Sequence, residues 1–154
     1  MPRVLESVDE LRALVGQEVG ASDWLEVTQA MINAFADTTH DHQWIHVNPD
    51  RARVETPFGT TIAHGFLTLS LMSHLASQAF QIQGGFRMGI NYGLNRVRFT
   101  APVPSGSRIR ARYKLQNLED IPQGIQVIWA VTVEVEGAPK PSLVAEWVLR
   151  WYYA

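Results

Sequence analysis

The sequence predicts an α+β fold in which an antiparallel sheet wraps one buried helix. Residues 66–80 are apolar on nearly all sides and contain neither Gly nor Pro, which is typical of a buried helix. The last third of the chain contains long segments in which apolar and polar side chains alternate, as in strands with one face in solvent. We therefore expect short helices first, the buried helix next and the sheet last.

Two helix starts precede the buried helix. Ser7 and Glu10 form a capping box, which predicts a short helix ended by Gly16. Thr28 can cap a second helix over residues 29–39. Residues 39–65 are polar and contain Gly and Pro, so we expect a long irregular segment with a short helix after Pro49. Such long loops are usually functional.

The expected strands lie at residues 90–99, 107–119, 124–136 and 142–153. Turn-forming residues at 104–106, 120–124 and 137–141 separate them, which predicts that consecutive strands pair antiparallel. Three tryptophans in these strands, Trp129, Trp147 and Trp151, occupy inward positions of the alternation. We expect them in the core or in a subunit interface.

The composition limits the classes of protein to consider. The chain has 154 residues, 13 basic and 15 acidic side chains and no Cys. We expect one domain over residues 1–154, with a short N-terminal helical segment at 1–24. The absence of Cys excludes disulfides, thiolate metal sites and a Cys nucleophile. Neither a signal peptide nor a membrane span is recognisable, so we expect a soluble cytoplasmic protein.

Charge is distributed unevenly along the chain. Residues 1–77 carry 4 basic and 10 acidic side chains, whereas residues 78–154 carry 9 and 5. For Arg110 and Arg112 we favour pairing with Glu134 and Glu136 across strands. Arg96 and Arg98 are left open between such pairing and the binding of a negatively charged partner. Because the chain is slightly acidic overall, we expect no nucleic-acid binding.

Charged residues make up only 18% of the chain, below the usual ~25%, which indicates that another subunit covers part of the surface.

The polar segment holds the candidate catalytic side chains. Asp41 and His46 are five residues apart, and together they can offer a carboxylate and an imidazole to one water molecule. The alternative for Asp41 is an ordinary turn former. At the start of the buried helix, the N–H of Gly65 suits a developing oxyanion. The alternatives are ordinary helix initiation there, and for His64 an ordinary hydrogen-bonded position before the helix.

His40, His42 and His46 follow an H-x-H-x-x-x-H pattern that resembles a metal-binding arrangement. Zinc sites need three or four ligands supported by further hydrogen bonds. A loop without Cys is a poor candidate for such a site. We therefore expect no metal.

The segment DHQWIHVNPDRARVETPFGTTIAHGFLTLSLMS resembles the hydratase motif of MaoC-like dehydratases and (R)-specific enoyl-CoA hydratases. That motif has Asp, two residues that are commonly Asn-Pro, an apolar residue, His, and then Ala-His-Gly at the start of the central helix. The resemblance covers about residues 25–152. It implies a hot-dog fold, in which a curved antiparallel sheet wraps a long central helix, and a homodimer.

The resemblance also assigns roles to individual residues. Asp41 and His46 match the catalytic dyad, and Gly65 matches the glycine whose N–H forms the oxyanion hole. Ser73, nine residues after His64, matches a helix position that supports the site, and Asn91 falls where the family's acyl tunnel lies. His64 belongs to the same substrate-binding group. One departure is that Gln43 and Trp44 replace Asn-Pro, so Trp44 must fix the loop by packing or leave it looser.

The implied activity is (R)-specific hydration of trans-2-enoyl-CoA, and the reverse dehydration of (R)-3-hydroxyacyl thioesters, as in fatty acid metabolism. The resemblance implies an acyl-CoA substrate, with an acyl group on an acyl carrier protein as the other carrier, and no cofactor is expected because CoA is part of the substrate. Two alternatives remain. One is a hot-dog acyl-CoA thioesterase, which directs water at the carbonyl carbon, and the other is a catalytically silent acyl-thioester-binding subunit.

Overall fold

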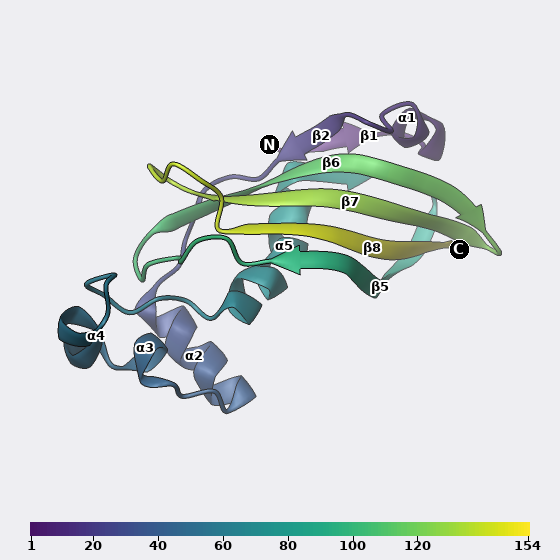
Figure 1. The fold of residues 1–154 in the computed structure, drawn as a ribbon. Helices are drawn as coiled ribbons and strands as arrows, with labels where there is room; N and C mark the ends of the chain where they lie inside the picture. Colours follow the sequence, from purple (N-terminus) through teal and green to yellow (C-terminus); the bar gives the residue numbers. More distant parts are fainter.

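The computed structural model describes all 154 residues. Two β-sheets and five helices make up the fold (Figure 1). In chain order the elements are β1 (Arg3–Leu5), α1 (Val8–Arg12), β2 (Glu18–Ala21), β3 (Leu25–Glu26), α2 (Gln29–Thr39), α3 (Trp44–Val47), α4 (Pro49–Glu55), α5 (Gly65–Ala79), β4 (Phe80–Ile82), β5 (Phe86–Arg98), β6 (Arg108–Ile121), β7 (Gly124–Val135) and β8 (Leu143–Tyr153).

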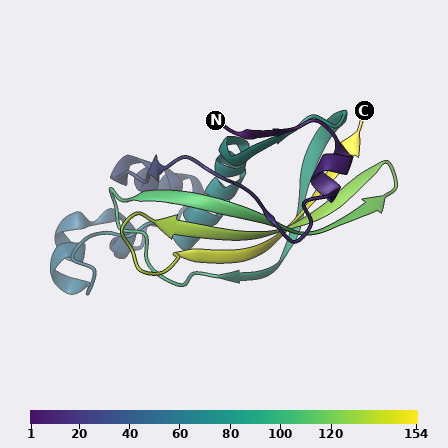
Figure 2. The same cartoon turned by 90° about the horizontal axis from the view of Figure 1, so that it is seen from above.

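The main sheet curves along α5, and α2, α3 and α4 lie together beyond one end of it (Figures 1 and 2). Its strand order is β2-β6-β7-β8-β5, with β3 also paired to β6. The α+β class and the hot-dog arrangement of a long helix wrapped by an antiparallel sheet are confirmed. No helix has the length and apolarity that crossing a membrane requires.

The four predicted long strands are all present, but one predicted pairing is wrong. β6 pairs with β7 and β7 with β8, as expected, whereas β5 pairs with β8 rather than with the consecutive β6. The segment between β5 and β6 does not close a tight hairpin, because its backbone bonds to other parts of the chain. Thr100 N–H donates to Ser142 O, and Ser105 N–H donates to Thr61 O.

The N-terminal segment 1–24 is less helical than predicted. Ser7 Oγ accepts the N–H of Glu10, so the expected cap is present, but the helix ends at Arg12 and Gly16 follows in a turn with φ +90°. The remaining residues form β1 and β2. β2 extends the main sheet because Gly20 lets its backbone approach Ala79 of α5, where a Cβ would lie 2.5 Å from the Ala79 carbonyl oxygen.

The core between the sheet and α5 is aromatic at its centre. Trp129 is fully buried and stacks on Phe80 with ring centroids 4.5 Å apart. Tyr113 donates its hydroxyl to the carbonyl oxygen of Met72 on α5, and burial raises the pKa of Tyr113. Trp147 is buried as well. The inward positions predicted for the tryptophans are therefore confirmed, with Trp151 half-buried.

α5 is not buried on all sides in the single chain. One face, which carries Leu67, Met72 and Leu75, packs into the core. The opposite face leaves Phe66, Ser70, Ser73 and Ser77 exposed. The sheet wraps α5 from one side only, so the helix presents a second face that the chain itself does not cover.

The arginines on the outer face of the sheet are paired, as predicted. Arg110 and Arg112 both bond to Glu134, and Arg108 bonds to Glu136. Burial alone would raise the pKa of Glu134, but the hydrogen bonds from the two arginines lower it. These surface pairs are worth little individually, but they engage the three arginines of β6.

Candidate active site

Asp41 stands directly after α2. The helix ends at His40, which adopts the left-handed conformation with φ 61° and turns the chain sharply. Asp41 is exposed, and one of its carboxylate oxygens accepts the N–H of Gln43 at 3.3 Å. Asp41 is thus a turn former of the common Asx type. The other carboxylate oxygen remains available for chemistry.

His46 lies in the short helix α3 and is buried, with 7% of its surface exposed. Its Nδ1 lies 2.7 Å from the carbonyl oxygen of Ile62. A carbonyl only accepts hydrogen bonds, so this contact assigns the proton to Nδ1. The lone pair is then on Nε2, which is the arrangement that a general base requires.

His64 immediately precedes α5 and is almost fully buried. Its Nε2 donates to the main-chain oxygen of Asp41 at 3.0 Å, and its ring stacks on that of His46 with centroids 3.8 Å apart. His64 therefore ties the Asp41 loop to the start of α5. This contact goes to a main-chain atom, so it favours a positioning role for His64.

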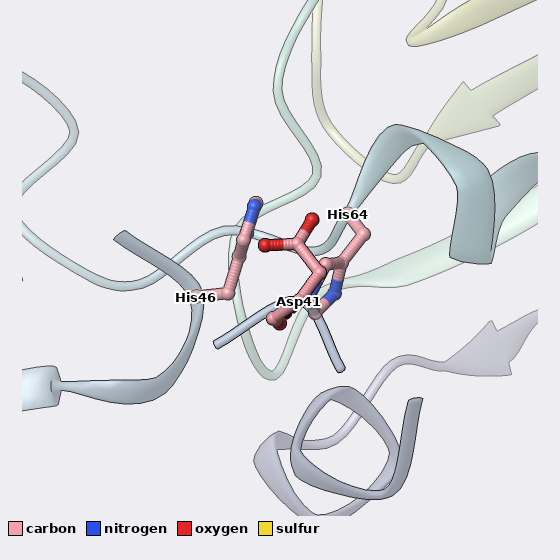
Figure 3. Close-up of side chains that lie close together, drawn as sticks. All are labelled: Asp41, His46 and His64. Carbon is pink, nitrogen blue, oxygen red and sulfur yellow. Dashed lines mark hydrogen bonds between the residues drawn. The ribbon is translucent and has the colours of Figure 1, made fainter. Parts of the chain in front are cut away.

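The side chains of Asp41, His46 and His64 gather in one place although they come from three separate segments (Figure 3). One ligand atom of each lies within 4.8 Å of the others. Since each hydrogen bond to water spans ~2.8 Å, one water molecule can bridge Asp41 and His46 across such a distance. The structure thus assembles the two residues that the sequence pattern pairs.

The same cluster is poorly arranged for a metal ion. The imidazole lone pairs lie in the ring planes, and the rings of His46 and His64 are nearly parallel at 23°, so their lone pairs do not converge on one point. His40 and His42 are exposed, and His42 bonds to Asp37 at 2.9 Å. The H-x-H-x-x-x-H pattern therefore does not come together around a common centre.

The environment of His46 lowers its pKa below the ordinary value of 6.5. Burial is the main cause, because it disfavours the charged imidazolium. The bond to Ile62 and the charge of Asp41 act in the opposite direction, and the neighbouring His64 acts in the same direction as burial. His46 is accordingly neutral, and able to accept a proton, near pH 7.

Gly65 opens α5 beside the cluster. As the first helical residue it carries one of the N–H groups that have no acceptor within the helix. A cavity of about 380 Å³ is lined by Gly65 and His46, together with Thr68, Phe58 and Phe99. A Cβ on Gly65 would lie 3.0 Å from the Phe99 ring, so the absence of a side chain here lets this ring pack against the helix start.

Ser73 and Asn91 lie apart from the dyad. Both line a groove between α5 and β5, formed by adjoining cavities of about 450 and 320 Å³. Asn91 accepts the indole N–H of Trp147 at 3.1 Å. Ser73 is eight residues beyond Gly65, roughly 12 Å along the helix axis. In this chain the two residues therefore contact neither Asp41 nor His46, and they belong to the groove.

Trp44 fixes the loop between the dyad residues by packing. The Arg51 guanidinium of α4 lies 4.0 Å from the centroid of the Trp44 ring, and the same guanidinium bonds to Glu55 at 3.0 Å. Trp44 is the first residue of α3, a position that suits Pro. The replacement of Asn-Pro by Gln43 and Trp44 left two possibilities, a loop fixed by packing of Trp44 or a looser loop. The structure has the packed loop.

Sequence reasoning missed Gln29, which contacts the backbone of His46, and Thr61, which contacts Gln29. Gln29, at the start of α2, donates from its side-chain amide to the main-chain oxygen of His46 at 2.7 Å. Thr61, which is 1% exposed, donates its hydroxyl to the Gln29 side chain. Gln29 and His46 are 17 positions apart, and Gln29 and Thr61 are 32 positions apart. No local sequence pattern therefore indicates either hydrogen bond.

Comparison with known proteins finds one matching family model and several similar dehydratases. The family model described as MaoC like domain matches residues 10–137. The 3-hydroxyacyl-thioester dehydratase Z of Mycobacterium tuberculosis is 53% identical over 150 residues, covering 97% of this chain and 98% of the relative. The 3-hydroxybutyryl-CoA dehydratase of Methylorubrum extorquens is 34% identical over 130 residues, covering 82% and 78%.

A solved structure resembles the fold as well. The (R)-hydratase from A. caviae involved in PHA biosynthesis superposes with a TM-score of 0.68 and 26% sequence identity. The superposition covers 88% of this chain and 94% of that one. The shared architecture therefore extends over nearly the whole of both chains.

Proposed function

The chain belongs to the MaoC-like dehydratase family, and from this premise we propose that it is an (R)-specific enoyl-CoA hydratase. At the coarser level, it is a hydro-lyase that interconverts 3-hydroxyacyl thioesters and their dehydrated forms. The observation that carries the finer proposal is the pairing of Asp41 with a buried, neutral His46 beside the free helix start at Gly65.

In the hydration direction, Asp41 and His46 bind one water molecule between them. The dyad removes a proton from this water as its oxygen adds to the β-carbon of the enoyl thioester, and a proton is returned to the α-carbon. His46 Nε2 is the atom suited to accept the proton, because Nδ1 is held by Ile62. Addition on one face gives the (R)-3-hydroxyacyl thioester.

Negative charge develops on the thioester oxygen as the enolate forms. The N–H of Gly65, at the positive end of the α5 dipole, is the donor proposed to stabilise it. Lining of one cavity by both Gly65 and His46 supports this assignment, since donor and base then face the same substrate. The groove with Ser73 and Asn91 is proposed to hold the acyl group.

One assay separates hydration from the two alternatives. Crotonyl-CoA and longer 2-enoyl-CoAs are incubated with the protein while loss of the conjugated thioester and release of free thiol are followed together. Hydration predicts loss of conjugation without thiol. Thiol release would show a thioesterase, and no change at any chain length would support a silent subunit. The same assay with a 2-enoyl group attached to an acyl carrier protein tests whether the protein accepts this carrier in place of CoA.

The depressed pKa of His46 predicts the pH dependence of hydration. The base must be neutral, so kcat/KM is expected to decline as His46 becomes protonated, with the midpoint of the decline below pH 6.5. The measurement is kcat/KM for crotonyl-CoA between pH 5 and 8. A midpoint at or above pH 6.5 would contradict a buried His46 with a lowered pKa as the base.

We also propose that the chain forms a homodimer through β5. β5 is an edge strand of 13 residues, and a long uncovered edge invites pairing with another strand. It exposes four large apolar side chains at 41% or more, namely Met88, Ile90, Tyr92 and Leu94. A second copy paired antiparallel through β5 would extend the sheet and cover the open face of α5.

Light scattering coupled to size-exclusion chromatography tests the dimer. The wild type is expected at twice the mass of the chain, and Ile90→Arg at the mass of one chain, because the charge would be buried at the interface. Val54→Arg is the matched control: Val54 is 78% exposed on α4, and the variant should remain dimeric. A monomeric wild type, or a dimeric Ile90→Arg, would contradict pairing through β5.

A further inference from the structure

We infer that Gln29 and Thr61 are positioning residues that hold His46 in its catalytic orientation. The inference rests on the proposed function, in which His46 activates water. Neither residue touches the reacting atoms. Their effect is exerted through the backbone of α3, which carries the base.

The hydrogen bonds run in one direction through the Gln29 amide. The Thr61 hydroxyl donates to Gln29 Oε1, and Gln29 Nε2 donates to the His46 carbonyl oxygen at 2.7 Å. Because Thr61 is buried and its hydroxyl faces the amide oxygen, the amide is held with its NH₂ group toward His46. Loss of the hydroxyl would leave Oε1 without this donor and release that orientation.

The neighbouring residue, Ile62, fixes the ring of the same histidine. Ile62 O accepts from His46 Nδ1, and Ile62 N–H donates to Ile45 O at 3.1 Å. Residues 61 and 62 therefore hold His46 at two points, at the imidazole directly and at the carbonyl through Gln29. The ring bond sets the tautomer, whereas the Gln29 bond limits the movement of α3 as a whole.

The segment that contains Thr61 and Ile62 and the segment that leads into Gln29 both bond to the same stretch of chain, residues 103–106 before β6. Ala63 N–H donates to Val103 O at 2.8 Å, and Ser105 N–H donates to Thr61 O at 2.9 Å. Gly106 N–H donates to Val27 O at 2.7 Å, just ahead of Gln29. The segment 103–106 thus bonds both to the stretch with Thr61 and to the residues just before α2, and through them it fixes the position of the base.

Misplacing a catalytic group by about 1 Å can cost up to about 100-fold in rate. We expect Gln29→Met, which keeps the length of the side chain, and Thr61→Val, which keeps its shape, to lower kcat about tenfold with KM changed less than about twofold. Thr61→Ser, which restores the hydroxyl, should recover most of the rate. Asn33→Ala is the control: exposed Asn33 accepts the second N–H of the Gln29 NH₂ group and does not bond to His46 or Thr61.

The decisive readout is the effect of Gln29→Met in a His46→Ala background. A positioning residue has nothing left to position there, so the further loss should be under about twofold. An undiminished loss in that background, or full activity of Gln29→Met and Thr61→Val with His46 intact, would overturn the inference alone. Full activity of His46→Ala by itself would instead overturn the proposed function.

Discussion

Asp41→Asn is expected to lower kcat for crotonyl-CoA hydration at least about 100-fold, the usual size of a general acid–base contribution. The amide keeps the shape and can still accept the Gln43 N–H that forms the turn, but it cannot take part in proton transfer. His46→Asn should lose a similar factor, because it removes Nε2 while leaving a donor near Ile62 O. Steady-state kinetics on folded variants provide the measurement.

The double variant should be little slower than the slower single variant, since both side chains act on one water molecule. Asp37→Asn and His42→Gln are the matched controls. They break an exposed Asp–His pair beside the site, and both variants should keep the wild-type rate. Full hydratase activity in Asp41→Asn would contradict the dyad assignment.

Gly65→Pro is expected to lower kcat about 100-fold or more, the usual cost of losing one oxyanion donor. Proline has no N–H, yet its fixed φ suits the first position of a helix. His64 before it has φ −57° and ψ 138°, a conformation that a following proline favours. The variant should therefore fold with α5 intact, which circular dichroism checks, while the donor is absent.

A steric effect must be separated from loss of the donor. Any Cβ at this position would approach the Phe99 ring to 3.0 Å, so Gly65→Ala, which keeps the N–H, is the matched control. Both variants are compared again in a Phe99→Ala background, where the contact is relieved. Equal rates for the Ala and Pro variants would mean that the Gly65 N–H does not stabilise the enolate.

The parts of this fold that follow local patterns could be predicted from the sequence. α5 follows from the long, largely apolar run without Gly or Pro over residues 66–80, β6 to β8 from alternation, and the helix starts from Ser7 and Thr28, whose side chains do cap their helices. The pairing of β5 with β8 could not be predicted, because it depends on where residues 99–107 are anchored. The short strands β1 to β4 are stabilised by partners far along the chain, which no local pattern indicates.

In the candidate site, too, some features follow from local sequence and others depend on contacts between distant segments. Asp41 and His46 are close in sequence, so their spacing suggests the pair, but only the family resemblance favours a dyad over an ordinary turn at Asp41. The stacking of His64 on His46, and the contact of Gln29 with the His46 backbone, join segments that are distant in sequence. The family resemblance places Ser73 and Asn91 among the substrate-binding residues, and in the single chain both line a groove apart from the dyad.

The central claim is that Asp41 and His46 add water to one face of an enoyl thioester. The most direct measurement is hydration of crotonyl-CoA in D₂O, with the configuration of the product determined at both new centres. The account predicts (R)-3-hydroxybutyryl-CoA with one deuterium at the α-carbon, added syn, and at least about 100-fold slower formation of this product with Asp41→Asn. An (S) product, release of free CoA, or an unchanged rate with Asp41→Asn would contradict it.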